Sequence, residues 1–167
     1  MSSARELVDD RPDENIFRIN RAVFNDPVIF EQEMVEIFGR TWLYLCHESQ
    51  VANHGDYMAT RIGTRPVFVI RGSDNGIRCF YDVCSHRGSR LTGRTSGSAK
   101  VLTCRYHGWC FNADGACTLV RGGDEAYRPE DLDRMGTNLN PIEQFGAYKG
   151  FLFGCLDADA PPLEEFL

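Results

Sequence analysis

Two cysteine–histidine pairs are the side chains of this 167-residue chain best suited to chemistry. Cys84 and His86 form the first pair and Cys104 and His107 the second, so the sequence reads C-x-H-x17-C-x2-H. Thiolate sulfur and imidazole nitrogen are ligands that zinc and iron accept readily. A glycine lies just beyond each histidine, as expected where a tight loop passes close to a metal. The spacing therefore predicts a metal centre built from two loops.

The order of these ligands is that of a Rieske [2Fe–2S] cluster, in which two thiolates hold one iron and two histidines hold the other. Two neutral histidines in place of thiolates remove negative charge, so an electron enters the site more readily. A zinc site also uses two cysteines and two histidines, but its first two ligands are usually spaced by roughly two to four residues. Cys84 and His86 are separated by a single residue. The motif thus predicts an electron-transfer module, with a structural zinc module as the alternative.

The composition indicates one domain with its own hydrophobic core, since 43% of the residues are apolar. No apolar run is long enough to span a membrane, and the polar start lacks the pattern of a signal peptide. We therefore expect a cytoplasmic protein without a membrane partner. The cysteines outside the two pairs fall mostly among apolar or aromatic residues, and we expect small buried thiols of a reducing compartment. They are Cys46, Cys79, Cys110, Cys117 and Cys155.

Charge is unevenly distributed along a chain whose net charge is −6. Between Val83 and Ala113 there is no aspartate or glutamate, and the stretch carries five basic residues: Arg87, Arg90, Arg94, Lys100 and Arg105. This basic stretch, called the basic island below, favours an acidic partner. That partner is either an acidic electron donor or the acidic surface of a neighbouring subunit. Nucleic acid is not expected to bind a chain this acidic. The alternative is that some of these side chains pair with acids elsewhere in the fold.

The first 40 residues predict an N-terminal arm followed by a helix. Residues 1–25 are polar and charged, so we expect a poorly ordered or wrapping segment. Asp26 and Pro27 are a favourable N-cap and first helical residue, and Gly39 is a favourable end. The apolar side chains of this helix lie on one face, which predicts that it packs against the domain; they are Phe30, Met34, Ile37 and Phe38.

The remainder predicts a mainly β domain over residues 41–160, an antiparallel sandwich-like fold in which two loops form a cluster-binding subdomain. A hairpin turn is expected at Asp74-Asn75-Gly76 and another turn at Asp114-Gly115. Residues 121–140 are polar, with glycine and proline, and predict a surface loop. The expected strands cover residues 41–46, 57–62, 66–71, 77–83, 117–120 and 147–157.

Longer stretches around the two pairs carry a family resemblance, namely residues 42–50, 84–88, 106–109 and 148–154. From the helix near residue 27 to Leu167, the chain resembles the Rieske domain of the large (α) subunit of bacterial aromatic ring-hydroxylating dioxygenases. It is most similar to the benzoate, toluate and anthranilate branch. The resemblance implies that Cys84 and Cys104 bind the inner iron of a [2Fe–2S] cluster. It also implies that His86 and His107 bind the outer iron near the surface.

One departure separates this chain from Rieske proteins of respiratory chains. That type has two further cysteines, joined in a disulfide beside the cluster, at the positions of Ser89 and Tyr106. It also has a serine at the position of Trp109, which supplies a hydrogen bond that raises the reduction potential. Fewer hydrogen bonds to the sulfurs imply a lower potential here. A low potential suits an oxygenase that receives electrons from a reductase.

The resemblance also implies a larger enzyme, an aromatic ring-hydroxylating dioxygenase. Electrons would pass from a reductase or ferredoxin, through the cluster, to a mononuclear non-haem Fe(II) in a catalytic domain of a neighbouring α subunit, and a β subunit is a further possible partner. That iron would dihydroxylate an aromatic substrate, expected to be a carboxylate. No catalytic residue is expected in this chain, because His47 and His54 are interpreted as structural or surface residues. Residues 161–167 are expected to begin a linker to the catalytic domain. The alternative is a free-standing Rieske-type ferredoxin.

Overall fold

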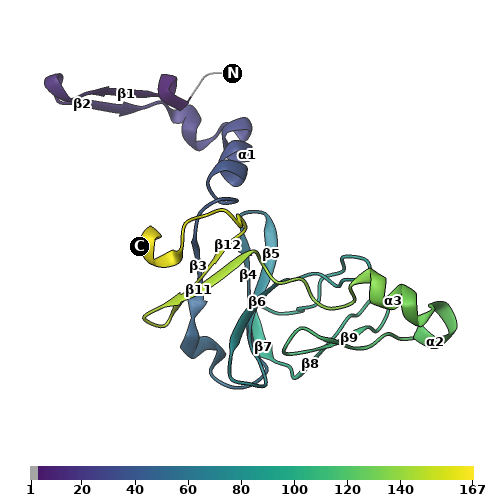
Figure 1. The fold of residues 1–167 in the computed structure, drawn as a ribbon. Coiled ribbons are helices and arrows are strands. Elements are labelled where there is room, and N and C mark those ends of the chain that lie inside the picture. The colour runs from purple at the N-terminus through teal and green to yellow at the C-terminus, as the bar shows by residue number, and fades with distance from the viewer. Residues whose placement is uncertain (1–3) are drawn as a thin grey trace.

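The computed structural model describes residues 4–167, and most of the regular structure in that range consists of antiparallel β-strands (Figure 1). A four-stranded sheet lies at the centre, in the order β6-β5-β4-β7. Its strands are β4 (Asp56–Ile62), β5 (Arg65–Arg71), β6 (Ile77–Tyr81) and β7 (Ser96–Ser98). The expected hairpin turn between β5 and β6 is confirmed, with Asn75 at a φ of 66°.

Strand β5 is the centre of the fold because both of its faces are buried. Successive side chains of a strand point to opposite faces of the sheet. Phe68 and Ile70 accordingly pack into a core that also contains both motif cysteines, whereas Val67 and Val69 pack into a second core on the other side. All four side chains are inaccessible to solvent. The sheet is therefore the middle layer between the candidate metal site and the rest of the domain.

The second core is covered by a three-stranded sheet in the order β11-β12-β3, formed by β3 (Leu43–His47), β11 (Gln144–Tyr148) and β12 (Phe151–Cys155). Leu45 and Leu152 point into that core, and the short 3-10 helix Glu48–Val51 follows β3. The single strand expected over 147–157 is wrong, because Lys149 and Gly150 turn the chain with φ of 49° and 84°. The apolar run that suggested one strand belongs to the second arm of a hairpin.

A smaller sheet, in the order β10-β9-β8, carries one of the two motif loops. Its strands are β8 (Val101–Thr103), β9 (Cys110–Asn112) and β10 (Cys117–Leu119), and the predicted turn at Gly115 joins the last two. Residues 121–140 are not simply a loop, as the sequence had indicated, because they contain helices α2 (Gly123–Ala126) and α3 (Pro129–Met135). Proline in the first turn of α3, followed by Glu130 and Asp131, favours a helix start there. Figure 1 shows β8, β9, α2 and α3 together at one end of the molecule.

The N-terminal arm is more regular than expected. Strands β1 (Val8–Arg11) and β2 (Ile16–Ile19) form an antiparallel hairpin, flanked by short 3-10 helices at Ala4–Leu7, Pro12–Glu14 and Arg21–Phe24. The hairpin extends away from the body of the domain rather than wrapping around it (Figure 1). The expectation of a poorly ordered or wrapping segment is therefore wrong for its described residues.

Helix α1 (Pro27–Glu36) begins where the sequence predicts, since the Asp26 side chain accepts a hydrogen bond from the Val28 amide at 2.8 Å. It ends three residues before Gly39. None of its residues is buried, and Phe30 remains 54% exposed, so the apolar face expected to pack against the domain does so over only part of its length. Only its C-terminal side approaches the domain, where Phe38 lies next to Gly63 in the β4–β5 turn.

The last described residues pack against the domain. Helix α4 (Leu163–Phe166) buries Leu163 in a small cluster with Trp42 and Cys155. The indole nitrogen of Trp42 donates a hydrogen bond to the carbonyl of Pro161 at 2.8 Å. In residues 4–167, none of the helices combines the length and the apolarity needed to cross a membrane.

Candidate functional site

Two loops with the same pattern of backbone hydrogen bonds bring the motif residues together. In the first, the Gly88 amide donates to the carbonyl of Cys84 at 2.8 Å, and in the second the Gly108 amide donates to the carbonyl of Cys104 at 2.9 Å. These glycines have φ of 68° and 72°, the left-handed region in which other residues are strained. The cysteine amides close the loops by donating to the carbonyls of Ser89 and Trp109, respectively.

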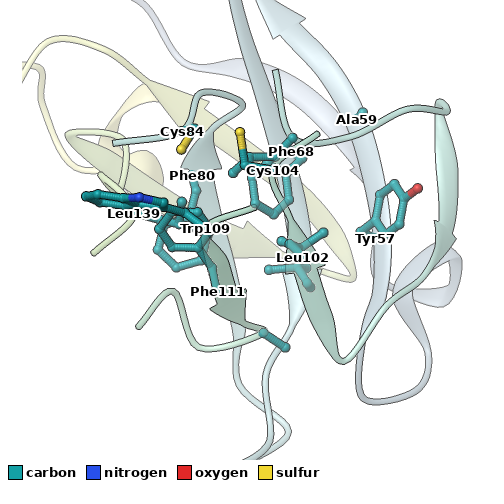
Figure 2. Close-up of a cluster of buried hydrophobic side chains, with 13 residues drawn as sticks. Tyr57, Ala59, Phe68, Phe80, Cys84, Leu102, Cys104, Trp109, Phe111 and Leu139 are labelled. Atoms are coloured by element: carbon teal, nitrogen blue, oxygen red, sulfur yellow. The ribbon is translucent and has the colours of Figure 1, made fainter. Parts of the chain in front are cut away.

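The two motif thiols face each other at the edge of the first core, above its aromatic rings (Figure 2). Cys84 and Cys104 are each 2% exposed, and their side chains are within hydrogen-bonding reach of each other. Burial raises the pKa of Cys84 to about 11. Burial acts in the same direction on Cys104, but amide hydrogen bonds from Tyr106 and His107 outweigh it and lower its pKa. The thiolate is the form that binds a metal, and these two amides stabilise it at Cys104.

The side chains of His86 and His107 lie next to each other, with ring centroids 4.6 Å apart. The Nδ1 atom of each ring is buried and has no hydrogen-bond partner. A buried nitrogen without a partner is unfavourable, so two of them side by side need an explanation. Burial, together with the nearby His107 and Arg87, lowers the pKa of His86 and favours the neutral imidazole that binds metals. Two open imidazole nitrogens beside two facing thiols fit a cluster that takes its ligands in pairs.

Aromatic side chains hold the two imidazoles in place. Trp109 is stacked on His86, with centroids 4.7 Å apart and planes 5° apart, and Tyr106 lies 3.8 Å from the ring of His107. The hydroxyl of Tyr127 lies 3.1 Å from Nε2 of His86. No sequence pattern singles out Tyr127, because it stands 41 residues from His86 in a polar segment.

Asp82 is a second residue that the sequence did not single out. It is fully buried, and its Oδ1 accepts from the amides of Leu91 and Thr92 at 3.1 and 2.9 Å. Its Oδ2 accepts from the Thr92 hydroxyl and from Nε of Arg90. The carboxylate thus fixes the far end of the first loop. A single acid just before the motif, followed by an acid-free stretch, is the only sequence signal that marks it.

The remaining histidines, His47 and His54, lie outside the two motif loops. Nδ1 of His47 accepts a hydrogen bond from the Ser49 amide at 3.2 Å and caps a 3-10 helix, and His54 is half-buried. Among the side chains that the structure describes, no three from histidine, cysteine or acidic residues surround a point where one metal ion could sit. The seven cysteines are free, and Cys46, Cys79 and Cys155 are buried as predicted, whereas Cys110 and Cys117 are only half-buried.

A basic hollow of about 680 Å³ opens over the two histidines. Arg87 and Arg105 of the basic stretch line it, and Arg121, from outside that stretch, adds a third positive charge. Of the five basic residues of the island, Arg90 pairs with Asp82 at 2.8 Å. The other four form no ion pair with any residue that the structure describes. The island is therefore mostly free to attract an acidic surface.

Comparison with known proteins also indicates a [2Fe–2S] site. The sequence model of a family described as the Rieske [2Fe-2S] domain matches residues 41–129, more than half of the chain. The chain belongs to this family. A Rieske domain binds a [2Fe–2S] cluster, so the cofactor predicted from the motif is confirmed at the level of the family.

The relatives that this Rieske chain matches are much longer proteins. It is 41% identical to toluate 1,2-dioxygenase subunit alpha of Pseudomonas putida, over 96% of this chain and 36% of that protein. It is 37% identical to the anthranilate 1,2-dioxygenase large subunit of Acinetobacter baylyi, over 96% of this chain and 34% of that protein. The resemblance to dioxygenase large subunits is confirmed, and the chain spans only about a third of their length.

Solved structures of Rieske oxygenases show the same fold. Naphthalene 1,2-dioxygenase from Rhodococcus sp. superimposes with a TM-score of 0.82 at 34% identity, over 88% of this chain and 33% of that one. A quaternary ammonium Rieske monooxygenase in complex with L-carnitine gives 0.75 at 34% identity, over 86% and 40%. The predicted mainly β Rieske fold is therefore confirmed.

Proposed function

We propose that this chain is the electron-relay domain of an aromatic ring-hydroxylating dioxygenase, with the cluster held by Cys84 and Cys104 on the inner iron and by His86 and His107 on the outer iron. The observation that carries the assignment is the pair of buried, unpartnered Nδ1 atoms beside two facing thiols. The proposed domain limits are 1–40 for the arm and helix, 41–160 for the Rieske domain, and 161–167 for the start of a linker.

When bound, the cluster stores one electron at a time. The protein supplies the surroundings for that transfer: buried thiols on the inner side, and histidines under a basic hollow on the outer side. The proposed donor is a reductase or ferredoxin with an acidic docking surface. The proposed acceptor is a mononuclear non-haem Fe(II) in the catalytic domain of a neighbouring α subunit. The proposed setting is a cytoplasmic enzyme, in which a β subunit is a further possible partner.

The proposed substrate is an aromatic carboxylate. Support comes from relatives named for toluate, 2-halobenzoate and anthranilate, with identities of 41%, 38% and 37%. These relatives are large dioxygenase subunits, so a free-standing Rieske-type ferredoxin is not favoured. Substrate contacts would belong to the catalytic domain of the whole protein.

The decisive experiment is metal and sulfide analysis of the chain purified without oxidative damage, combined with EPR after reduction. We expect about two irons and two acid-labile sulfides per chain, and the low average g-value of a cluster with mixed cysteine and histidine ligands. Stoichiometric zinc without sulfide would contradict the proposal. For the relay, rapid mixing of the reduced chain with an oxidised acceptor should show one-electron oxidation, and the chain alone should consume no oxygen in response to an aromatic acid.

A further inference from the structure

The two histidines of the site differ in what their outer nitrogens contact. Nε2 of His86 lies 3.1 Å from the hydroxyl of Tyr127. Among the described residues, the ring of His107 has no hydrogen-bond partner at either nitrogen, and it lines the basic hollow beside Arg105. Both histidines line the hollow, but only the outer nitrogen of His86 has a hydrogen-bond partner within the part of the chain that the structure describes.

Both the backbone and the ring of Tyr127 are held in place by neighbouring residues. Its amide donates to the carbonyl of Gly123 at 3.0 Å and ends helix α2. Its ring stands edge-on to Trp109 at 6.2 Å and 81°, and edge-on to His86 at 6.4 Å and 86°. The ring is half-buried against the first core. Tyr127 thus braces both members of the stacked Trp109–His86 pair.

We infer that Tyr127 is a positioning residue that lowers the reduction potential of the site through His86. The inference rests on the proposed function, because it takes Nδ1 of His86 as an iron ligand. A histidine that binds metal through Nδ1 keeps its proton on Nε2, so the oxygen of Tyr127 is the acceptor of this hydrogen bond. An acceptor on Nε2–H makes the imidazole a stronger electron donor and stabilises the more oxidised iron.

The test is the midpoint potential of the cluster-loaded Tyr127→Phe variant, measured by redox titration with EPR. This change removes the hydroxyl and keeps the ring that braces Trp109. Loss of a hydrogen bond of ordinary net strength should raise the equilibrium constant for one-electron reduction about fivefold, which is about 40 mV. Tyr81→Phe is the matched control, because it also removes a hydrogen-bonded tyrosine hydroxyl, which donates to Glu143 at 2.8 Å and lies outside the hollow. Its potential should equal that of the unchanged chain.

The outcomes separate this inference from the proposed function. If the unchanged chain shows no Rieske EPR signal, the proposed function fails. If the signal is present and Tyr127→Phe has an unaltered or lower potential, the role of Tyr127 alone is overturned. If Tyr127→Leu changes the midpoint potential and Tyr127→Phe does not, the effect belongs to the ring, and the hydrogen-bond role is also overturned. Should the variants not retain the cluster, a crystal structure of the loaded chain decides: a distance beyond about 3.5 Å between the hydroxyl and Nε2 would refute the bond.

Discussion

Asp82 binds Thr92 twice, through its amide at 2.9 Å and through its hydroxyl, in a site closed to solvent. Asp82→Ala would leave these buried donors and the Leu91 amide without a partner. We expect it to lower the free energy of unfolding by about 3 kcal/mol and to weaken cluster retention, because the first loop loses its far anchor. Urea denaturation and iron content measure both effects.

Arg90→Ala is the control for this first prediction. It removes the ion pair with Asp82 but keeps the buried hydrogen bonds, and 56% of the Arg90 side chain is exposed. A partly exposed pair contributes about 1 kcal/mol or less. Equal losses of stability in the two variants would show that the ion pair, rather than the loop anchor, is what Asp82 provides.

The four proposed ligands should respond differently to substitution. His86→Cys or His107→Cys, where the cluster survives, should lower the midpoint potential by on the order of 100 mV, because a thiolate adds negative charge where the electron enters. Cys84→Ser or Cys104→Ser should lose the cluster and the order of both loops. Redox titration and near-ultraviolet circular dichroism test these outcomes. An unchanged potential in a clustered His→Cys variant would contradict the ligand assignment.

Reduction by the physiological donor should depend on the basic hollow. Arg87→Glu or Arg105→Glu should slow the second-order rate constant about tenfold at low ionic strength, and the difference should shrink as salt screens the charges. Lys149→Glu, in the β11–β12 turn and outside the hollow, is the matched control for net charge. Stopped-flow reduction over a range of salt concentrations gives the comparison. Equal slowing by all three reversals would show that net charge alone matters.

Stability should fall in alkaline solution because of two buried thiols. Burial raises the pKa of Cys46 from 9.0 to about 11, and it raises the pKa of Cys79 further. A group whose pKa is higher in the folded chain favours folding while it is protonated. That contribution is complete below pH 9.0 and is lost as the pH rises through about 11. Urea denaturation of the Cys46→Ala, Cys79→Ala double variant should show a shallower alkaline decline than the unchanged chain, and an identical decline would refute this origin.

The sequence was informative where a local rule determines the structure. The spacing of Cys84, His86, Cys104 and His107 identifies the candidate ligands because each pair lies within one tight loop. The same holds for the Asp26 cap and the turn at Asn75, where a single residue type favours one backbone geometry. Such features need no knowledge of distant parts of the chain.

Features that depend on distant contacts could not be predicted in this way. Strand β7 consists of Ser96, Gly97 and Ser98, and it forms through its pairing with β4 without an apolar pattern of its own. Helices α2 and α3 are short and lie in a polar segment. Tyr127 reaches His86 only because those helices fold over the second loop. Helix α1 shows the opposite error. Its apolar side chains recur on one face, which predicts burial, but the helix buries none of them in this chain.

Strand β5 connects the two hydrophobic cores of the domain. Phe68 and Ile70 face the side of the candidate metal loops, and Val67 and Val69 face the opposite core, so one segment of backbone belongs to both. Because both cores pack on this strand, we expect neither core to unfold while the other remains folded. Free energy gained when the loops take up their metal is consequently shared with the distant β3–β12 sheet, and the domain behaves as one cooperative unit.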